Sequence, residues 1–157
     1  MSADPAPQFV LQTEKEARRF GARLGALLRP GRTVLLEGPV GAGKSHIARA
    51  AIRALAGEAT EVPSPSFTLV QTYDTPGGEI WHADLYRLTH PAEAEELGLL
   101  DAMETAIVLV EWPDRLGADR PGSAITLTLS HRDEGRGLTI SGADSATLRA
   151  LAEGLST

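Results

Sequence analysis

The chain has 157 residues, and 42% of them are hydrophobic, which is enough for one ordinary core. It contains no cysteine, so neither disulfides nor thiolate metal sites can stabilise the fold. No apolar run approaches the roughly 20 residues of a membrane helix, and the opening MSADPAPQ carries no signal pattern. We therefore expect a cytoplasmic protein that forms a single domain over residues 1–157 and binds no membrane.

Charge is spread unevenly along the chain. The net charge of −6 argues against a protein that grips a nucleic-acid backbone unaided, because such binding depends on clustered Lys and Arg. Residues 14–32 are nevertheless rich in arginine, and residues 74–104 are rich in Asp and Glu. These two segments are either ordinary solvated faces or docking surfaces for a partner, and the sequence leaves both interpretations open.

The first elements have clear boundaries. Thr13 and Glu16 form a capping-box pattern ahead of a helix with apolar residues at helical spacing, which ends before Pro30. A short apolar strand is predicted over residues 33–37, and an alanine-rich helix over residues 45–56.

The rest of the chain continues this mixture of elements. Strands are predicted over residues 67–73, 79–83, 107–111, 124–130 and 138–141, and helices over residues 92–97 and from Ala143. Neither an internal repeat nor a domain boundary is visible. The pattern predicts an α/β fold in which helices flank a central sheet.

Between the strand at 33–37 and the helix at 45–56 lies the segment LEGPVGAGKSH. Its residues Gly38, Gly43, Lys44 and Ser45 fit the pattern G-x-x-x-x-G-K-[ST], which is a P-loop. The missing side chains let backbone N–H groups converge on phosphate oxygens, and the helix N-terminus adds its positive end. Lys44 can reach the β- and γ-phosphates, and the Ser45 hydroxyl is a ligand for Mg²⁺. The sequence therefore predicts a P-loop NTPase-like domain.

A P-loop site also needs a carboxylate at the end of a neighbouring strand to hold the metal or its water. Glu111 follows four apolar residues of a buried strand, and Asp84 follows a less apolar run. The alternatives are a surface acid for Glu111 and a structural salt bridge with Arg87 for Asp84. Both acids can serve one metal. Together with Lys44 of the P-loop, Asp84 and Glu111 are therefore the candidate catalytic residues. His82 is interpreted as a packing or supporting residue.

The sequence contains no asparagine. The common P-loop GTPases recognise guanine through an Asn-Lys-x-Asp motif, so ATP is favoured over GTP as the nucleotide.

Four motifs together resemble the TsaE family, also called YjeE: GAGKS at 41–45, SPSFTLV at 64–70, HADLYRL at 82–88 and VEWP at 110–113. The similarity spans residues 14–113 in matching order. It implies an ATPase of bacterial tRNA threonylcarbamoyladenosine synthesis that acts with TsaB and TsaD. These partners modify the adenosine beside the anticodon in tRNAs that read codons beginning with A. The resemblance thus implies that the chain supplies ATP hydrolysis and meets tRNA only through the complex.

The resemblance also implies roles for individual residues. Ser45, Glu111 and Asp84 would address Mg²⁺, Trp112 would lie beside the nucleotide, and Ser66 would belong to a switch-like loop. The nucleotide-binding residues implied by the P-loop and the resemblance are Gly38, Gly41, Ala42, Gly43, Lys44, Ser45, His46, Ser66, Trp112, Glu14 and Arg136. Two departures from the family pattern are Pro39 with Val40 in place of Asp-Leu, and Ser66 in place of threonine.

Two other functions fit the same P-loop. One is a small-molecule kinase in which Arg115 and Arg120 clamp phosphate, although so short a chain leaves little room for an acceptor pocket and lid. The other is an assembly switch that hydrolysis resets. No motif places an arginine finger, so we expect the chain alone to be a slow ATPase. The resemblance, together with the basic and acidic segments, implies that its partners stimulate it.

Overall fold

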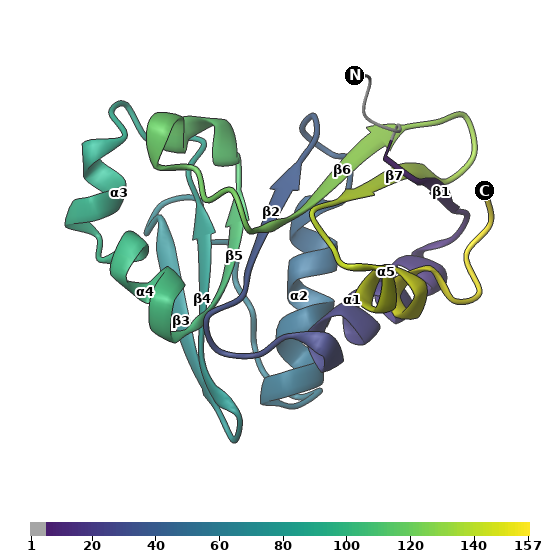
Figure 1. Cartoon of the computed structure of the whole chain (residues 1–157), viewed down its shortest axis with the longest axis horizontal. Coiled ribbons are helices and arrows are strands. Elements are labelled where there is room, and N and C mark those ends of the chain that lie inside the picture. Colours follow the sequence, from purple (N-terminus) through teal and green to yellow (C-terminus); the bar gives the residue numbers. More distant parts are fainter. Residues whose placement is uncertain (1–5) are drawn as a thin grey trace.

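A single seven-stranded sheet forms the centre of the protein in the computed structural model, which describes residues 6–157 (Figure 1). Residues 1–5 lie outside the described residues. They belong to the opening MSADPAPQ, for which the sequence predicts no targeting signal. The strand order is β1-β7-β6-β2-β5-β4-β3, with helices on both faces. The predicted α/β architecture is confirmed. Within residues 6–157, no helix combines the length and apolar character that a bilayer crossing requires.

The middle of the sheet is parallel and its edges are antiparallel. Strands β2, β4, β5 and β6 run parallel, whereas β1 and β6 pair antiparallel with β7, and β3 pairs antiparallel with β4. The strands are β1 (Gln8–Leu11), β2 (Thr33–Glu37), β3 (Val70–Thr75), β4 (Gly78–Asp84), β5 (Ile107–Glu111), β6 (Ile125–His131) and β7 (Arg136–Ser141).

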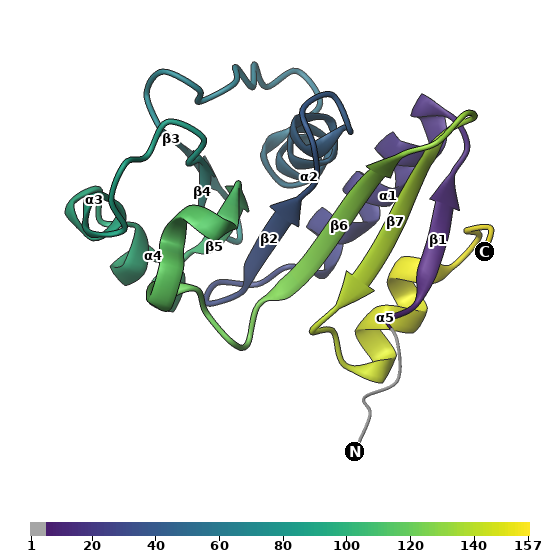
Figure 2. The same cartoon turned by 90° about the horizontal axis from the view of Figure 1, so that it is seen from above.

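Both faces of the central strands are buried, which explains their continuous apolar sequence. On β2, Val34 and Leu36 face the core layer that includes α1, α2 and α5, whereas Leu35 belongs to the layer with α3 and α4. Helices α1 and α2 pack against each other; in Figure 2, α1 lies behind β6 and β7, and α2 lies beyond the end of β2. The helices are α1 (Glu14–Leu27), α2 (Lys44–Ala56), α3 (Ala92–Glu96), α4 (Leu99–Thr105) and α5 (Ser145–Ala152), with a 3₁₀ helix η1 (Pro113–Asp119).

Some predicted boundaries are wrong. The strand predicted over residues 67–73 begins only at Val70, because Leu69 adopts a left-handed conformation with φ of 68° and interrupts the extended backbone. The last helix begins at Ser145 rather than Ala143, since the Asp144 side chain caps it by accepting from the Thr147 N–H. Strand β1, helix α4 and η1 were not predicted.

Helices α1 and α2 approach each other closely through two glycines of α1. A Cβ atom on Gly21 would lie 2.6 Å from the Ala50 Cβ, and one on Gly25 would lie 2.5 Å from the Ala51 carbonyl oxygen. Real Cβ atoms do not approach other heavy atoms this closely, so neither position has room for a side chain. The close crossing fixes α2, and therefore the P-loop that precedes it, against the rest of the core.

We expect Gly25→Ala to lower the free energy of unfolding. Overpacking costs about 1 to 3 kcal/mol, and this exceeds the gain of up to about 1 kcal/mol that alanine has over glycine in a helix. The obstacle is a backbone carbonyl, which cannot rotate away. Urea unfolding of the variant measures the change. Gly122→Ala, at a site with no other atom within 4 Å of the added Cβ, is the matched control and should change stability little. Equal stability of both variants would contradict the close crossing.

Candidate active site

The P-loop joins the central strand β2 to the N-terminus of α2. Gly43 has φ of 106° and caps α2 without a side chain, so its backbone takes a left-handed form that favours glycine. At Gly38, with φ of 142°, an added Cβ would lie 2.5 Å from the Leu129 carbonyl oxygen of β6. The sheet therefore restricts the loop at its start, and the helix N-terminus shapes its end.

Two acids meet at the carboxyl edge of the sheet, beside the P-loop. In the strand register, Leu36 of β2 pairs with Glu111 of β5, and Glu111 pairs with Asp84 of β4. Because the three strands are parallel, their last residues lie next to one another at the same edge. Both acids are almost completely buried, with 2% exposure for Glu111 and 6% for Asp84. The register thus brings together the two carboxylates that the sequence singled out.

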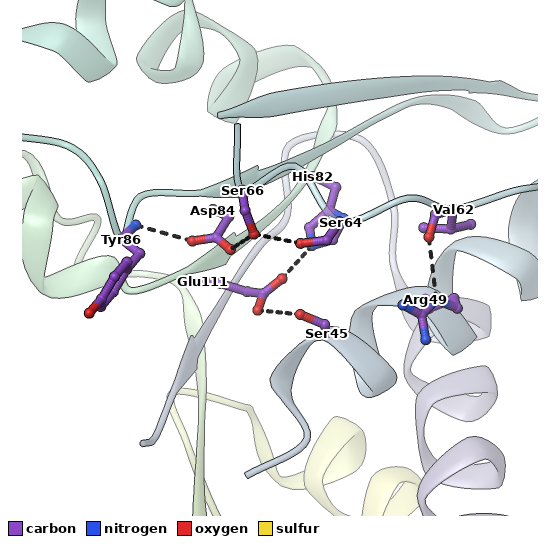
Figure 3. A network of polar contacts seen from close by, with 9 residues as sticks. All are labelled: Ser45, Arg49, Val62, Ser64, Ser66, His82, Asp84, Tyr86 and Glu111. Carbon is purple, nitrogen blue, oxygen red and sulfur yellow. Dashed lines mark hydrogen bonds and ion pairs between the residues drawn. The ribbon is translucent and has the colours of Figure 1, made fainter. Parts of the chain in front are cut away.

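Both oxygens of the Glu111 carboxylate have partners (Figure 3). The Ser45 hydroxyl donates to Oε1 at 2.8 Å, and the His82 Nε2 lies 2.7 Å from Oε2. A buried carboxylate is costly unless it is paired and hydrogen-bonded, and these two contacts meet that need. His82 is itself 1% exposed, and its Nδ1 has no hydrogen-bond partner among the described residues. His82 therefore supports Glu111 directly, in agreement with its interpretation as a supporting residue.

Asp84 holds the loop that precedes β3. The Ser66 hydroxyl donates to Oδ2 at 3.3 Å, and the Tyr86 backbone N–H donates to Oδ1 at 3.1 Å. Ser64 and Ser66 share a hydrogen bond of 2.7 Å between their hydroxyls. The alternative interpretation of Asp84, a structural salt bridge with Arg87, is not observed within residues 6–157; the Arg87 guanidinium lies over the Phe67 ring instead. Asp84 therefore connects the 64–70 motif to the edge of the sheet.

The Lys44 ammonium group is held within its own loop. It donates to the carbonyl oxygens of Gly38 and Pro39, the latter at 3.2 Å, and lies 3.8 Å from the centre of a Trp112 ring. Burial lowers the pKa of Lys44 below its ordinary value, and the negative charges of Glu111 and Asp84 oppose that change. Both acceptors are neutral backbone carbonyls, so an anion such as phosphate can take their place as the partner of the Lys44 ammonium group.

Trp112 is the first residue after β5 and has an unusual backbone. Its φ of 60° and ψ of 53° are left-handed, which is uncommon for a bulky residue and is found where surrounding structure enforces it. This conformation turns the chain from the sheet edge into η1, and the side chain packs against Lys44 and against Tyr86, with ring centres 5.0 Å apart. Trp112 therefore forms one wall of the cavity; its place beside a nucleotide stays a prediction.

A cavity of about 660 Å³ opens above the P-loop and the two acids. Eleven of the predicted residues line it, and they span the sequence from the first helix to the last strand. They are Glu14, Gly41, Gly43, Lys44, Ser45, His46, Ser66, Asp84, Glu111, Trp112 and Arg136. Two predicted residues do not line it. Ala42 is fully buried beneath the loop, and Gly38 contributes its carbonyl oxygen to Lys44 instead.

Sequence reasoning assigned no role in the site to five other residues that line the cavity, one of which is Val40 within the P-loop itself. Ser64, Tyr86 and Arg87 lie inside motifs of the family resemblance, so the motifs contained the signal. Arg49 had only a positional signal, since it lies one helical turn after Ser45 on α2. Its Nε donates to the Val62 carbonyl oxygen at 3.3 Å.

The side chains at the sheet edge suit a hard cation. Serine hydroxyl and carboxylate oxygens are the ligands that Mg²⁺ prefers, and Ser45, Glu111 and Asp84 supply them at one place. Residues 6–157 contain no group of three or more His, Asp or Glu side chains arranged as a metal cage. This donor set fits a cation that is shared with the phosphates of a nucleotide.

The comparisons with known proteins show the family of this chain. A family model described as "Threonylcarbamoyl adenosine biosynthesis protein TsaE" matches residues 11–138. The chain belongs to the TsaE family. That match contains every residue predicted for the site, from Glu14 to Arg136.

Curated members of the TsaE family match over most of their length. The protein named "tRNA threonylcarbamoyladenosine biosynthesis protein TsaE" in Rickettsia bellii is 39% identical over 131 residues, or 83% of this chain and 91% of the relative. The protein of the same name in Haemophilus influenzae is 34% identical over 128 residues, or 78% and 80% of the two chains. The crystal structure of Bacillus subtilis YdiB is 20% identical with a TM-score of 0.71, and it covers 96% of this chain and 97% of its own. This structural likeness shows a shared fold.

The contact between His82 and Glu111 is testable without any ligand. We expect His82→Leu to lower the free energy of unfolding by about 3 to 5 kcal/mol, because it leaves a buried carboxylate without one partner. His82→Leu combined with Glu111→Leu should recover part of that loss, since the unpaired charge is then gone. Urea unfolding measures both variants. His90→Leu, at an exposed histidine, is the control. A double variant that is no more stable than His82→Leu would refute the pairing.

Proposed function

We propose that this TsaE-family chain binds ATP above the P-loop and hydrolyses it with Mg²⁺ to support threonylcarbamoyl modification of tRNA. The observation that carries the proposal is the convergence of Lys44, Ser45 and Glu111, where a glycine loop opens a helix beside the end of a parallel strand. In such a loop the backbone N–H groups and the lysine bind phosphate oxygens. Bound Mg²⁺ would neutralise charge on those phosphates.

The two carboxylates have different proposed tasks. Glu111 is held from both sides by Ser45 and His82, and such a fixed position supports a role in orienting an attacking water. Asp84 instead bonds Ser66 and the Tyr86 backbone, which relates it to the 64–70 loop. We assign Glu111 to hydrolysis and Asp84 to the metal and the switch-like loop.

The positions of Arg115 and Arg120 do not favour the kinase alternative, which needs them as a phosphate clamp. Arg120 forms an ion pair with Glu37, and neither Arg115 nor Arg120 lines the cavity. A phosphate clamp has to reach the transferred group. Among the arginines that do line the cavity, Arg136 comes from the distant strand β7, and its guanidinium lies against the backbone of Gly43. This arrangement suits a second contact to bound phosphate rather than the recognition of an acceptor.

The partners in the proposal are TsaB and TsaD, with tRNA reached through their complex. Similarity to proteins named for tRNA threonylcarbamoyladenosine biosynthesis supports this role. Two aromatic residues are exposed near the site: Tyr86 lines the cavity, and Phe67 lies under the guanidinium of Arg87, which also lines it. Exposed aromatic residues suit contact with a partner that closes over the nucleotide. An assembly switch that hydrolysis resets remains the alternative within the same complex.

Lys44→Ala tests ATP binding. We expect the variant to fold and to bind ATP about tenfold to 100-fold more weakly, because it loses the charge-assisted contact to phosphate. Calorimetry with ATP and Mg²⁺ measures the affinity. Lys15→Ala is the matched control, since Lys15 is the other lysine of the chain and lies exposed on α1. Wild-type affinity in Lys44→Ala would disprove the P-loop assignment.

Two matched substitutions separate the carboxylates. Glu111→Gln should keep ATP affinity and lower the hydrolysis rate by about 10²-fold or more, because the amide cannot take a proton from water. Asp84→Asn should weaken Mg²⁺ binding, so that hydrolysis needs a higher Mg²⁺ concentration, and should disturb the Ser66 contact. Steady-state phosphate release over a range of Mg²⁺ concentrations measures both. Normal turnover in Glu111→Gln together with an inactive Asp84→Asn would reverse the two roles.

Reconstitution with partners tests the whole proposal. We expect slow ATP hydrolysis by the chain alone, faster hydrolysis with TsaB plus TsaD, and tRNA modification only when ATP is present. Stimulation should weaken as salt rises if charged faces contribute to docking. The assay compares the chain alone, with TsaB, and with both partners, at low and moderate salt. Fast turnover that partners leave unchanged would exclude an assembly-dependent ATPase, and phosphate on a small acceptor would favour the kinase.

A further inference from the structure

A second, smaller cavity lies between α1 and α2, next to the ATP cavity. It measures about 260 Å³. Ala22 of α1 and Ala50 of α2 form its small-residue lining, and Arg18, Arg49 and Arg53 surround it with His46 and Glu58. Arg18 and Ala22 are four residues apart on α1, and Arg49 and Arg53 are four apart on α2, so each pair lies on one helix face. The arginines therefore converge from two helices.

The close helix crossing explains why a cavity forms here. Gly21 contacts α2 so tightly that no Cβ fits, and the neighbouring positions Ala22 and Ala50 carry only methyl groups. The long arginine side chains around these two alanines enclose a shallow cavity. Close packing of the two helix backbones fixes the positions from which the arginines extend.

Two of the three arginines are fixed in place by the loop after α2. The Arg53 Nε donates to the Thr60 carbonyl oxygen at 3.1 Å, and the Arg49 Nε donates to the Val62 carbonyl oxygen at 3.3 Å. Each bond uses one of the five N–H donors of a guanidinium. The remaining donors stay available for a ligand, and the side chains lose little further freedom when they bind it.

The positive charge of this cavity is not neutralised by protein acids. Among residues 6–157, the ion pairs within 4.0 Å are His82 with Glu111 and Arg120 with Glu37, so none involves the three arginines. Glu58 is the one carboxylate in the lining, against three guanidinium groups. The Nε2 atom of His46 is buried and has no hydrogen-bond partner within the described residues. The three guanidinium groups thus give the cavity an excess of positive charge and of N–H donors.

We propose that this cavity, defined by Arg18, Arg49, Arg53 and His46, is a second anion site that takes a compact phosphate-bearing ligand of the size of pyrophosphate. Planar guanidinium groups match pairs of phosphate oxygens, and three of them around one small cavity match a ligand with several charges. Arg49 and His46 line both this cavity and the ATP cavity, so the second site shares a wall with the first. The second site does not depend on ATP hydrolysis.

The test is calorimetric titration of the full chain with pyrophosphate in the absence of Mg²⁺. Because the P-loop can also take pyrophosphate, the titration is repeated in Lys44→Ala, where we expect binding to the second site to remain. Arg18→Gln is the informative variant: Arg18 is exposed and makes no side-chain hydrogen bond or ion pair to other described residues, so the fold should not change. In the Lys44→Ala background it should weaken pyrophosphate binding about tenfold or more, while Arg18→Gln alone should leave ADP affinity unchanged.

Arg19→Gln is the matched control. It removes the same charge from the next residue of α1, which lines neither cavity, and should leave pyrophosphate affinity unchanged. Equal weakening by Arg18→Gln and Arg19→Gln would show general charge attraction and overturn the proposal. So would full loss of binding in Lys44→Ala, unaltered binding in Arg18→Gln, or binding of a short single-stranded RNA without binding of pyrophosphate. None of these outcomes depends on whether the chain hydrolyses ATP.

Discussion

The buried carboxylate of Glu111 is the interaction on which the arrangement of the site depends. A charged group taken out of water costs several kcal/mol unless its oxygens are satisfied. Here the two oxygens are met from opposite directions, by the first turn of α2 and by the neighbouring strand β4. The fold can therefore bury this charge only when β4, β5 and the P-loop helix are all in their correct positions.

Strand register is constrained by the same contact. A slip of β4 by one residue would move His82 to the other face of the sheet, because successive side chains of a strand point to opposite sides. Glu111 would then lose one partner, and Asp84 would no longer lie beside it at the edge. The polar site thus specifies the pairing of strands whose apolar residues alone would tolerate alternatives. A buried charge at the site therefore also helps to select the native register.

The sequence predicted the features that depend on local patterns. Helix α1 has a capping box, β5 has an unbroken apolar run, and the P-loop has fixed glycine spacing, so each could be found from neighbouring residues. Placing Asp84 and Glu111 together needed only the rule that parallel strands end at one edge. Strand β1 has four residues and pairs with β7 from the far end of the chain, which no local pattern records. The positive φ of Leu69 could not be predicted either. The Leu69 carbonyl oxygen accepts from the Asp84 N–H at the end of β4, and this contact between distant residues has no local sequence pattern.

The two tryptophans of the chain occupy different surroundings. Trp112 lies with its ring beneath the Lys44 ammonium group, whereas Trp81 donates its indole N–H to the exposed Glu79 on β4. Indole emission responds to a nearby charge and to solvent, so a ligand that draws the ammonium group toward itself changes the light emitted by Trp112. The chain therefore carries a built-in optical reporter of its P-loop lysine, and replacing Trp81 with phenylalanine would leave that reporter as the single fluorescent indole.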